Sequence, residues 1–252
     1  MSTPRLFLAG LFAALAVIPS FAAAAPVNFV IDPAASRVTL TGTFQGHALA
    51  PPAAGSDTAA YTGTFEGDLS DGKLRLESTV PRSVPFPTPL RPGYPDLGST
   101  QEASYGFTFE TPQGTADASI RGLQLYFGNP YSPPMDVSGG TFVPADAGFF
   151  VEGGGLDVAL PGAQRVFEVD LHGNGAPNAA AGPGTLTTAG NVQTLTIPLS
   201  STFTVSSADL TLSLNGQIVA TRVVPEPGGV ALAIASLALL VCRRHLRRPS
   251  VA

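Results

Sequence analysis

Cysteine, tryptophan and lysine are almost missing from this chain of 252 residues. It has one cysteine, Cys242, one lysine, Lys73, and no tryptophan. A single cysteine excludes a disulfide framework and a zinc site built from cysteines. The 13 basic and 18 acidic residues give a net charge of −5, the wrong sign for a protein that binds nucleic acid through its phosphates. We therefore expect no nucleic-acid partner.

Sequence motifs of nucleophilic catalysis and of nucleotide binding are also missing. The chain has no Gly-x-Ser-x-Gly, no P-loop and no dinucleotide fingerprint, and His47 and His172 are the only histidines before the C-terminal tail. A serine or cysteine nucleophile needs a base beside it, and no such pair stands out in this sequence. We predict that the protein is not an enzyme, has no catalytic residue and needs no cofactor.

The first 24 residues have the order of a secretory signal peptide. Arg5 precedes an uninterrupted apolar run from Leu6 to Ile18, and small residues follow. The run is too short to span the roughly 30 Å hydrocarbon core as an anchor, although an uncleaved anchor is the alternative. Cleavage after Ala25 would place the rigid ring of Pro26 just past the scissile bond. We therefore predict that signal peptidase cleaves after Ala24, with Ala25 as the second site.

The C-terminal residues 224–252 have three parts of different chemistry. The first part, Val224-Pro225-Glu226-Pro227, cannot be helical because each proline restricts itself and the residue before it. The uncharged residues 227–242 would span about 24 Å as a helix, and snorkelling side chains could make up the remaining length. A basic cluster then follows, formed by Arg243, Arg244, Arg247 and Arg248. The positive-inside rule keeps these arginines cytoplasmic and places the rest of the chain outside the cytoplasmic membrane.

This tail resembles the PEP-CTERM sorting signal of exported bacterial proteins. The matching features are Pro-Glu-Pro at 225–227, the apolar stretch from Val230 to Val241, and the closing arginines. The resemblance implies processing near Pro-Glu-Pro by an exosortase, a membrane enzyme similar to a transpeptidase. It also implies a location at the surface, envelope or exopolysaccharide matrix of Gram-negative bacteria. The alternative is an ordinary tail anchor.

Residues 25–223, between these two ends, are expected to form one all-β domain. Apolar and polar residues alternate with period two in segments rich in Thr, Val, Phe and Tyr. These segments are 37–44, 61–69, 73–80, 105–111, 116–127, 165–171, 192–199, 202–206, 209–214 and 217–222. Asp71-Gly72 and Asn215-Gly216 suit two-residue hairpin turns. We predict a single antiparallel β-sandwich or barrel of about ten to twelve strands.

Glu168, Asp170 and His172 would share one face of a strand. Residues two apart on a strand are separated by about 7 Å, so one small ion could not be held by all three. Two of them, with carbonyl groups of the following glycine-rich loop, could hold Ca²⁺. The alternative is a polar strand face in contact with water.

Two further groups of residues suggest binding or catalysis. Glu66 and Asp68 form a same-face pair about 7 Å apart, close to the carboxylate separation of inverting glycosidases. Tyr126 and Tyr131 flank a loop and could stack on a sugar ring. The alternatives are a solvent-exposed carboxylate pair, and tyrosines that pack in the core or anchor the loop.

The leading functional hypothesis is an exported, non-enzymatic protein of the cell surface or extracellular matrix. Its partners would be signal peptidase, an exosortase-type enzyme and, before processing, the cytoplasmic membrane that holds the tail. Three alternatives remain for the β domain. It could be a carbohydrate-binding module for exopolysaccharide, a hydrolase that uses the carboxylates above, or a barrel that holds a small lipophilic molecule.

Overall fold

The computed structural model describes residues 27–79, 81–84, 103–127, 133–143, 149–162, 166–176, 178 and 182–224. This part of the chain is all-β and antiparallel, as predicted, and its one helical element is a 3₁₀ turn at Ser206–Ala208. No helix in these residues is long and apolar enough to cross a membrane. The predicted signal peptide and the predicted tail from Pro225 onward lie outside the described residues.

The described residues form seventeen strands, several of them only two residues long. In chain order they are β1 Val27–Ile31, β2 Arg37–Phe44, β3 His47–Ala48, β4 Thr58–Thr62, β5 Thr64–Ser70, β6 Lys73–Thr79, β7 Arg82–Ser83, β8 Ala103–Thr111, β9 Gly114–Tyr126, β10 Met135–Asp136, β11 Thr141–Phe142, β12 Phe149–Ala159, β13 Val166–Asp170, β14 Gly175–Ala176, β15 Gly184–Ala189, β16 Val192–Val205 and β17 Leu210–Val223.

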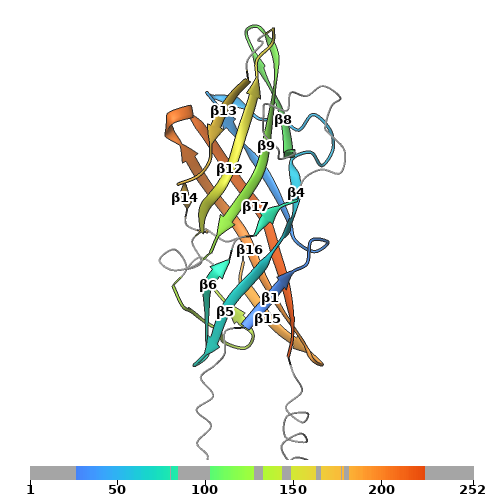
Figure 1. The fold of residues 1–252 in the computed structure, drawn as a ribbon, viewed down its shortest axis with the longest axis vertical. Coiled ribbons are helices and arrows are strands. Elements are labelled where there is room, and N and C mark those ends of the chain that lie inside the picture. Colours follow the sequence, from blue (N-terminus) through green and yellow to red (C-terminus); the bar gives the residue numbers. More distant parts are fainter. Residues whose placement is uncertain are drawn as a thin grey trace, which may run out of the picture.

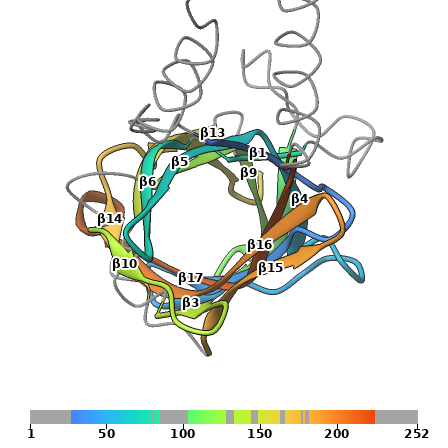
Figure 2. The ribbon, with the colours of Figure 1, turned by 90° about the horizontal axis from the view of Figure 1, so that it is seen from below.

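The strands join into one large antiparallel sheet (Figure 1), and β17 is one of its two longest strands, with 14 residues. It pairs with β16 along its whole length, and its other edge pairs with β2 and then with β1. The sheet continues from β1 through β5 and β6, and from β2 through β4, β7 and β9 to β12 and β13. Figure 2, which looks along the molecule, shows these strands curving around a common interior.

Inward-facing apolar side chains from all parts of the sheet form one hydrophobic core. Alternate residues of β16 and β17 are buried, as a strand with one face on the core requires. Aromatic rings are among the largest buried side chains. The ring centroids of Phe65 and Phe127, and of Phe127 and Phe149, are each 5.9 Å apart and connect β5 to β12. Burial of such side chains contributes about 1.5–3 kcal/mol each to folding.

The predicted hairpin turn at Asn215-Gly216 is wrong, because β17 runs straight through these two residues. The φ angle of Gly216 is +154°, and a Cβ atom there would overlap the carbonyl oxygen of Arg37 in β2. Glycine is therefore needed for the close approach of the two backbones. The chain turns instead between Val205 and Leu210, where Asp209 is left-handed with φ +50°.

The turn predicted at Asp71-Gly72 is confirmed. Both residues have positive φ, +53° and +72°, which a type I′ turn requires, and they connect β5 to β6. The predicted strand 61–69 is divided at Gly63, with φ +131°, into β4 and β5. The two halves pair with different neighbours, β4 with β2 and β5 with β1.

One edge of the sheet is completed by a side chain. The strand β15 covers only residues 192–196 of β16 on that side, and no further ladder covers the rest of this edge of β16 within the described ranges. Asn178, which is fully buried, donates from Nδ2 to the carbonyl oxygen of Pro198 at 2.9 Å and accepts from the Ser200 N–H at 2.9 Å. Its carboxamide thus makes the two hydrogen bonds that a neighbouring strand would make. Proline is tolerated at position 198 because its missing N–H faces this edge.

Candidate functional site

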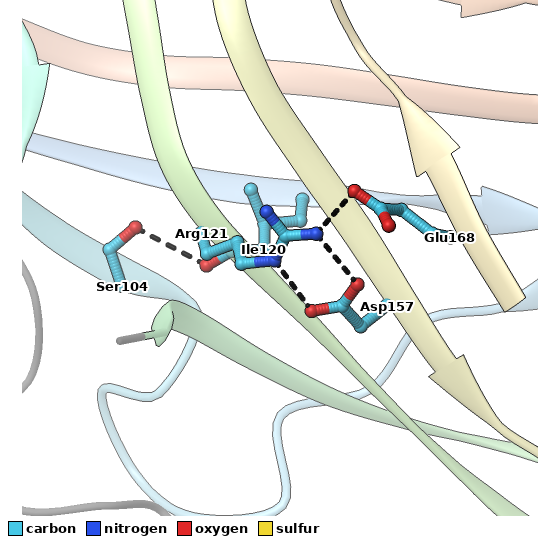
Figure 3. A network of polar contacts seen from close by, with 5 residues as sticks. All are labelled: Ser104, Ile120, Arg121, Asp157 and Glu168. Carbon is cyan, nitrogen blue, oxygen red and sulfur yellow. Dashed lines mark hydrogen bonds and ion pairs between the residues drawn. The ribbon is translucent and has the colours of Figure 1, made fainter. Parts of the chain in front are cut away.

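Three neighbouring strands place a charged cluster on the face of the sheet opposite the core (Figure 3). Arg121 of β9 donates from Nε to Asp157 Oδ2 at 2.8 Å and from Nη2 to Asp157 Oδ1 at 3.2 Å, with Asp157 on β12. The same Nη2 donates to Glu168 Oε1 of β13 at 2.5 Å. The side chains of Arg121 and Asp157 are 13% and 8% exposed, whereas that of Glu168 is 59% exposed.

A run of glycines in β12 makes room for this arginine. Gly155 lies opposite Arg121 in the ladder, and a Cβ atom on it would be 3.2 Å from the guanidinium carbon. The β9–β12 ladder also shifts register on both sides of Gly153. The guanidinium group therefore lies over the backbone of Gly155 and reaches Asp157, two residues further along the same strand.

The two carboxylates favour the charged form of Arg121. Hydrogen bonding to Asp157 raises the pKa of Arg121; desolvation opposes this effect, and Glu168 adds to it. Two carboxylates that accept from one permanently charged guanidinium group form a cross-strand clamp. Its chemical role in the fold is to join β9, β12 and β13. A second polar contact lies nearby, where Ser104 Oγ donates to the carbonyl oxygen of Ile120 at 3.3 Å (Figure 3).

The three residues predicted as a Ca²⁺ site have separate partners within the protein. Glu168 binds Arg121, and Asp170 Oδ1 accepts from the backbone N–H of His172 at 2.9 Å. The His172 ring packs edge-on against Phe150, with centroids 5.5 Å apart. Among the described residues, no group of three or more His, Cys, Asp or Glu side chains could hold a metal ion. The two-residue Ca²⁺ site stays a prediction without geometric support.

The other carboxylate pair, Glu66 and Asp68, lies on β5. Glu66 is opposite Asn28 of β1, and Asp68 is opposite Arg75 of β6, with a register shift between Glu66 and Gly67. This pair and the pair formed by Glu168 and Asp170 lie on strands that share no ladder in the described part of the chain. They are therefore two separate pairs of carboxylates, and the hydrolase hypothesis stays a prediction.

The predicted sugar platform and sorting tag are only partly described. Tyr126 ends β9, is half-buried and lies opposite Phe150 of β12. Tyr131 lies outside the described residues. Val224 is the last described residue, and its N–H donates to the carbonyl oxygen of Asn191 at 2.7 Å. The remaining predicted sorting residues and both predicted cleavage residues, Ala24 and Ala25, also fall outside the described ranges.

The sequence did not single out the buried tyrosine pair of the core. Tyr61 of β4 and Tyr105 of β8 are both fully buried, and their hydroxyl oxygens are 3.1 Å apart. The Tyr105 hydroxyl donates to the carbonyl oxygen of Val38 at 3.3 Å. Burial raises the pKa of both phenols. The alternation of each strand indicates an inward tyrosine, but only the strand arrangement brings the two together.

The clamp of Arg121, Asp157 and Glu168 was likewise not predicted. Alternation along 117–121 shows that Arg121 faces away from the core, but its partners depend on the ladder register.

Comparison with known proteins gives no match to a family model, to a curated protein or to a solved structure.

Proposed function

We propose that this chain is an exported, non-enzymatic protein of the cell surface or extracellular matrix, processed at both ends. One observation carries the proposal. The first described strand begins at Val27, just after the predicted signal-peptide cleavage site, and the last described strand ends at Val223, just before Pro225. The described sheet thus lies wholly within the predicted exported region 25–223, and removal of either end would take no described strand from it.

The positions of the two domain ends support delivery by a C-terminal tag. β1 and β17 are antiparallel neighbours, with Val30 opposite Thr221, so Val27 and Val224 lie at the same end of the sheet. A tail inserted in the cytoplasmic membrane would hold the domain by that end and direct the opposite end away from the membrane. Cleavage near Pro-Glu-Pro by an exosortase-type enzyme would then separate an intact domain from its anchor.

We infer that the sheet closes into a barrel rather than dividing into a sandwich. A return path of neighbours supports this inference: β6, β5, β1, β17, β16, β15 and β11 follow one another by ladders, and β10 pairs with β6. Ser138, two residues after β10, forms an antiparallel bridge with Thr141 of β11. The large buried rings inside favour a packed interior over a cavity for a lipophilic ligand.

Intact mass measurement of the protein from envelope and medium fractions of its native host tests the proposal. We expect a mass that lacks residues 1–24 and everything beyond Pro-Glu-Pro at 225–227. Extra mass on the new C-terminus would identify what the domain is attached to. A protein found only in the membrane that retains Arg243 to Arg248 would overturn the proposal and leave an ordinary tail anchor.

A second candidate function is binding of extracellular polysaccharide. It is favoured by a surface other than the predicted tyrosine loop, namely an uncharged sheet face rich in hydroxyl groups. That face lies on β2, β16 and β17 and is developed below.

A further inference from the structure

The outer face of β2, β15, β16 and β17 is almost free of charge. These strands contain two charged residues, Arg37 and Arg222, and fifteen threonines and serines. Arg222 points toward the interior, where its guanidinium carbon lies 5.1 Å from the ring centroid of the fully buried Phe29. Only Arg37 therefore places a charge on the outside of these four strands.

Six hydroxyl side chains form two rows across three adjacent strands of this face. They are Thr43, Thr211 and Thr204 in one row, and Thr41, Ser213 and Thr202 in the other. We call these six residues the hydroxyl face. Within each row the strands are about 4.8 Å apart, and the two rows are about 7 Å apart along the strands.

Hydrogen bonds across the strands orient part of the hydroxyl face. The hydroxyl oxygens of Thr202 and Ser213 are 2.7 Å apart, and those of Thr204 and Thr211 are 3.3 Å apart. A hydroxyl group has one donor and two acceptor positions, so a bonded pair still offers hydrogen bonds to an external partner. Thr41 and Thr43 are exposed beside these pairs.

Other charges of the domain lie elsewhere, apart from Asp209, which is exposed in the turn between β16 and β17. The clamp of Arg121, Asp157 and Glu168 and the 3.4 Å ion pair of Lys73 with Asp136 lie on strands outside this face. Figure 2 shows β15, β16 and β17 on one side of the molecule and β5, β9 and β13 on the opposite side. The hydroxyl face therefore matches an uncharged partner, since contact with it leaves no charge without water.

We propose that the hydroxyl face binds a neutral polysaccharide chain. Sugar hydroxyl groups donate and accept hydrogen bonds, as the threonine and serine hydroxyl groups of the face do. The sheet curves around its interior (Figure 2), so a flexible chain can follow the face better than a flat lattice can. This inference rests on the proposed function, in which the domain lies in an extracellular matrix, and it names the partner class.

Affinity electrophoresis of the full chain in a mild detergent tests the inference. Native gels contain dextran, hydroxyethyl cellulose or a neutral galactomannan, and a parallel gel contains the anionic polymer alginate. We expect at least one neutral polymer to retard the protein and alginate to have no effect. The variant T41V/T43V/T202V/T204V removes four hydroxyl groups but keeps the branched side-chain shape, and it should weaken binding at least fivefold.

Two variants with only two substitutions each keep the test decisive. T41V/T43V removes two hydroxyl groups of the face, and T62V/T64V removes two exposed ones on β4 and β5 outside it. We expect weaker binding only for the first pair, with both variants keeping the melting temperature of the parent protein. If the quadruple variant T41V/T43V/T202V/T204V fails to melt cooperatively, the comparison of these two double variants decides whether the hydroxyl face binds the polymer.

Three outcomes would overturn the inference: no retardation by any neutral polymer, equal retardation of T41V/T43V and the parent, or retardation by alginate alone. Its failure can be distinguished from failure of the proposed function. A protein that is correctly processed and exported, but binds no neutral polymer, refutes the hydroxyl face alone. A protein that keeps its C-terminal arginines refutes the export proposal, whatever the gels show.

Discussion

Two phenol groups inside the core are satisfied by one another and by the backbone. Because the single hydroxyl hydrogen of Tyr105 is donated to the carbonyl oxygen of Val38, the hydrogen between the two tyrosines comes from Tyr61. The two side chains are therefore not equivalent. Removing the Tyr61 hydroxyl leaves the bond from Tyr105 to Val38 in place, whereas removing the Tyr105 hydroxyl breaks both bonds.

This asymmetry predicts different costs for two conservative variants. Tyr61→Phe should lower the free energy of unfolding by about 0.5–1.5 kcal/mol, the value of one hydrogen bond. Tyr105→Phe should cost about 1–3 kcal/mol, because the buried Tyr61 hydroxyl loses its partner. Urea unfolding at neutral pH measures both values. Equal costs would show that the two hydroxyl groups do not form this chain of bonds.

The same pair predicts loss of stability in alkali. Burial raises the pKa of Tyr61 and Tyr105 above the value of about 10 that phenols have in an unfolded chain. Above about pH 10 the unfolded chain releases phenol protons that the folded protein keeps. The free energy of unfolding therefore keeps the full contribution of the two phenols below about pH 10. It falls as the pH rises further, by at most about 1.4 kcal/mol per pH unit for each tyrosine.

Urea unfolding at a series of pH values above about 9 measures this slope. Tyr61→Phe should reduce the slope, since one of the two buried phenols is gone. A slope that is the same in the parent and in Tyr61→Phe would assign the alkaline loss of stability to other groups.

At the scale of elements, the clamp joins three strands through one guanidinium group. Arg121→Met should lower the free energy of unfolding by about 3 kcal/mol, because it leaves the buried carboxylate of Asp157 without its counter-charge. The matched control is Glu168→Gln, which should cost only about 0–1 kcal/mol since Glu168 is largely exposed. Thermal or urea unfolding compares the two. A large effect of Glu168→Gln would contradict the assignment of Asp157 as the main partner.

The side chain that completes the sheet edge gives a further prediction. Asn178→Ala removes the acceptor of the Ser200 N–H and the donor to the Pro198 carbonyl oxygen, and should cost about 1–3 kcal/mol. Hydrogen exchange at the Ser200 amide should become faster, while the amides paired in the β16–β17 ladder keep their protection. Unchanged exchange at Ser200 would mean that the carboxamide does not cover this edge.

Glycine explains two failures of the element prediction. β12 contains Gly153, Gly154 and Gly155, which interrupt its alternation, so no strand was predicted there. Gly216 was interpreted as a turn residue, although it serves the close approach of β2 to β17. Sequence indicates that glycine permits an unusual backbone, but the neighbouring strand decides whether the chain turns or another backbone passes close by.

At the scale of the whole molecule, every described strand lies between the two predicted processing sites. Residues 25–224 expressed without either end should therefore fold alone, with a β-type circular dichroism spectrum and one cooperative unfolding transition. The physical reason is that the described core draws its side chains only from Phe29 to Ala220. A product that unfolds without cooperativity would show that the ends contribute to the fold.

The sequence by itself determined the all-β antiparallel class, because side-chain alternation is a local property of each strand. It also determined the hypotheses about the two ends, which rest on the order of charge, apolar length and proline. Only the tertiary structure decided which strands are neighbours and in which register. That register joins Arg121 to Asp157 and Glu168, pairs Tyr61 with Tyr105, and aligns Thr43, Thr211 and Thr204 in a row. Pairing between strands distant in sequence depends on the complete core, so local patterns do not specify it.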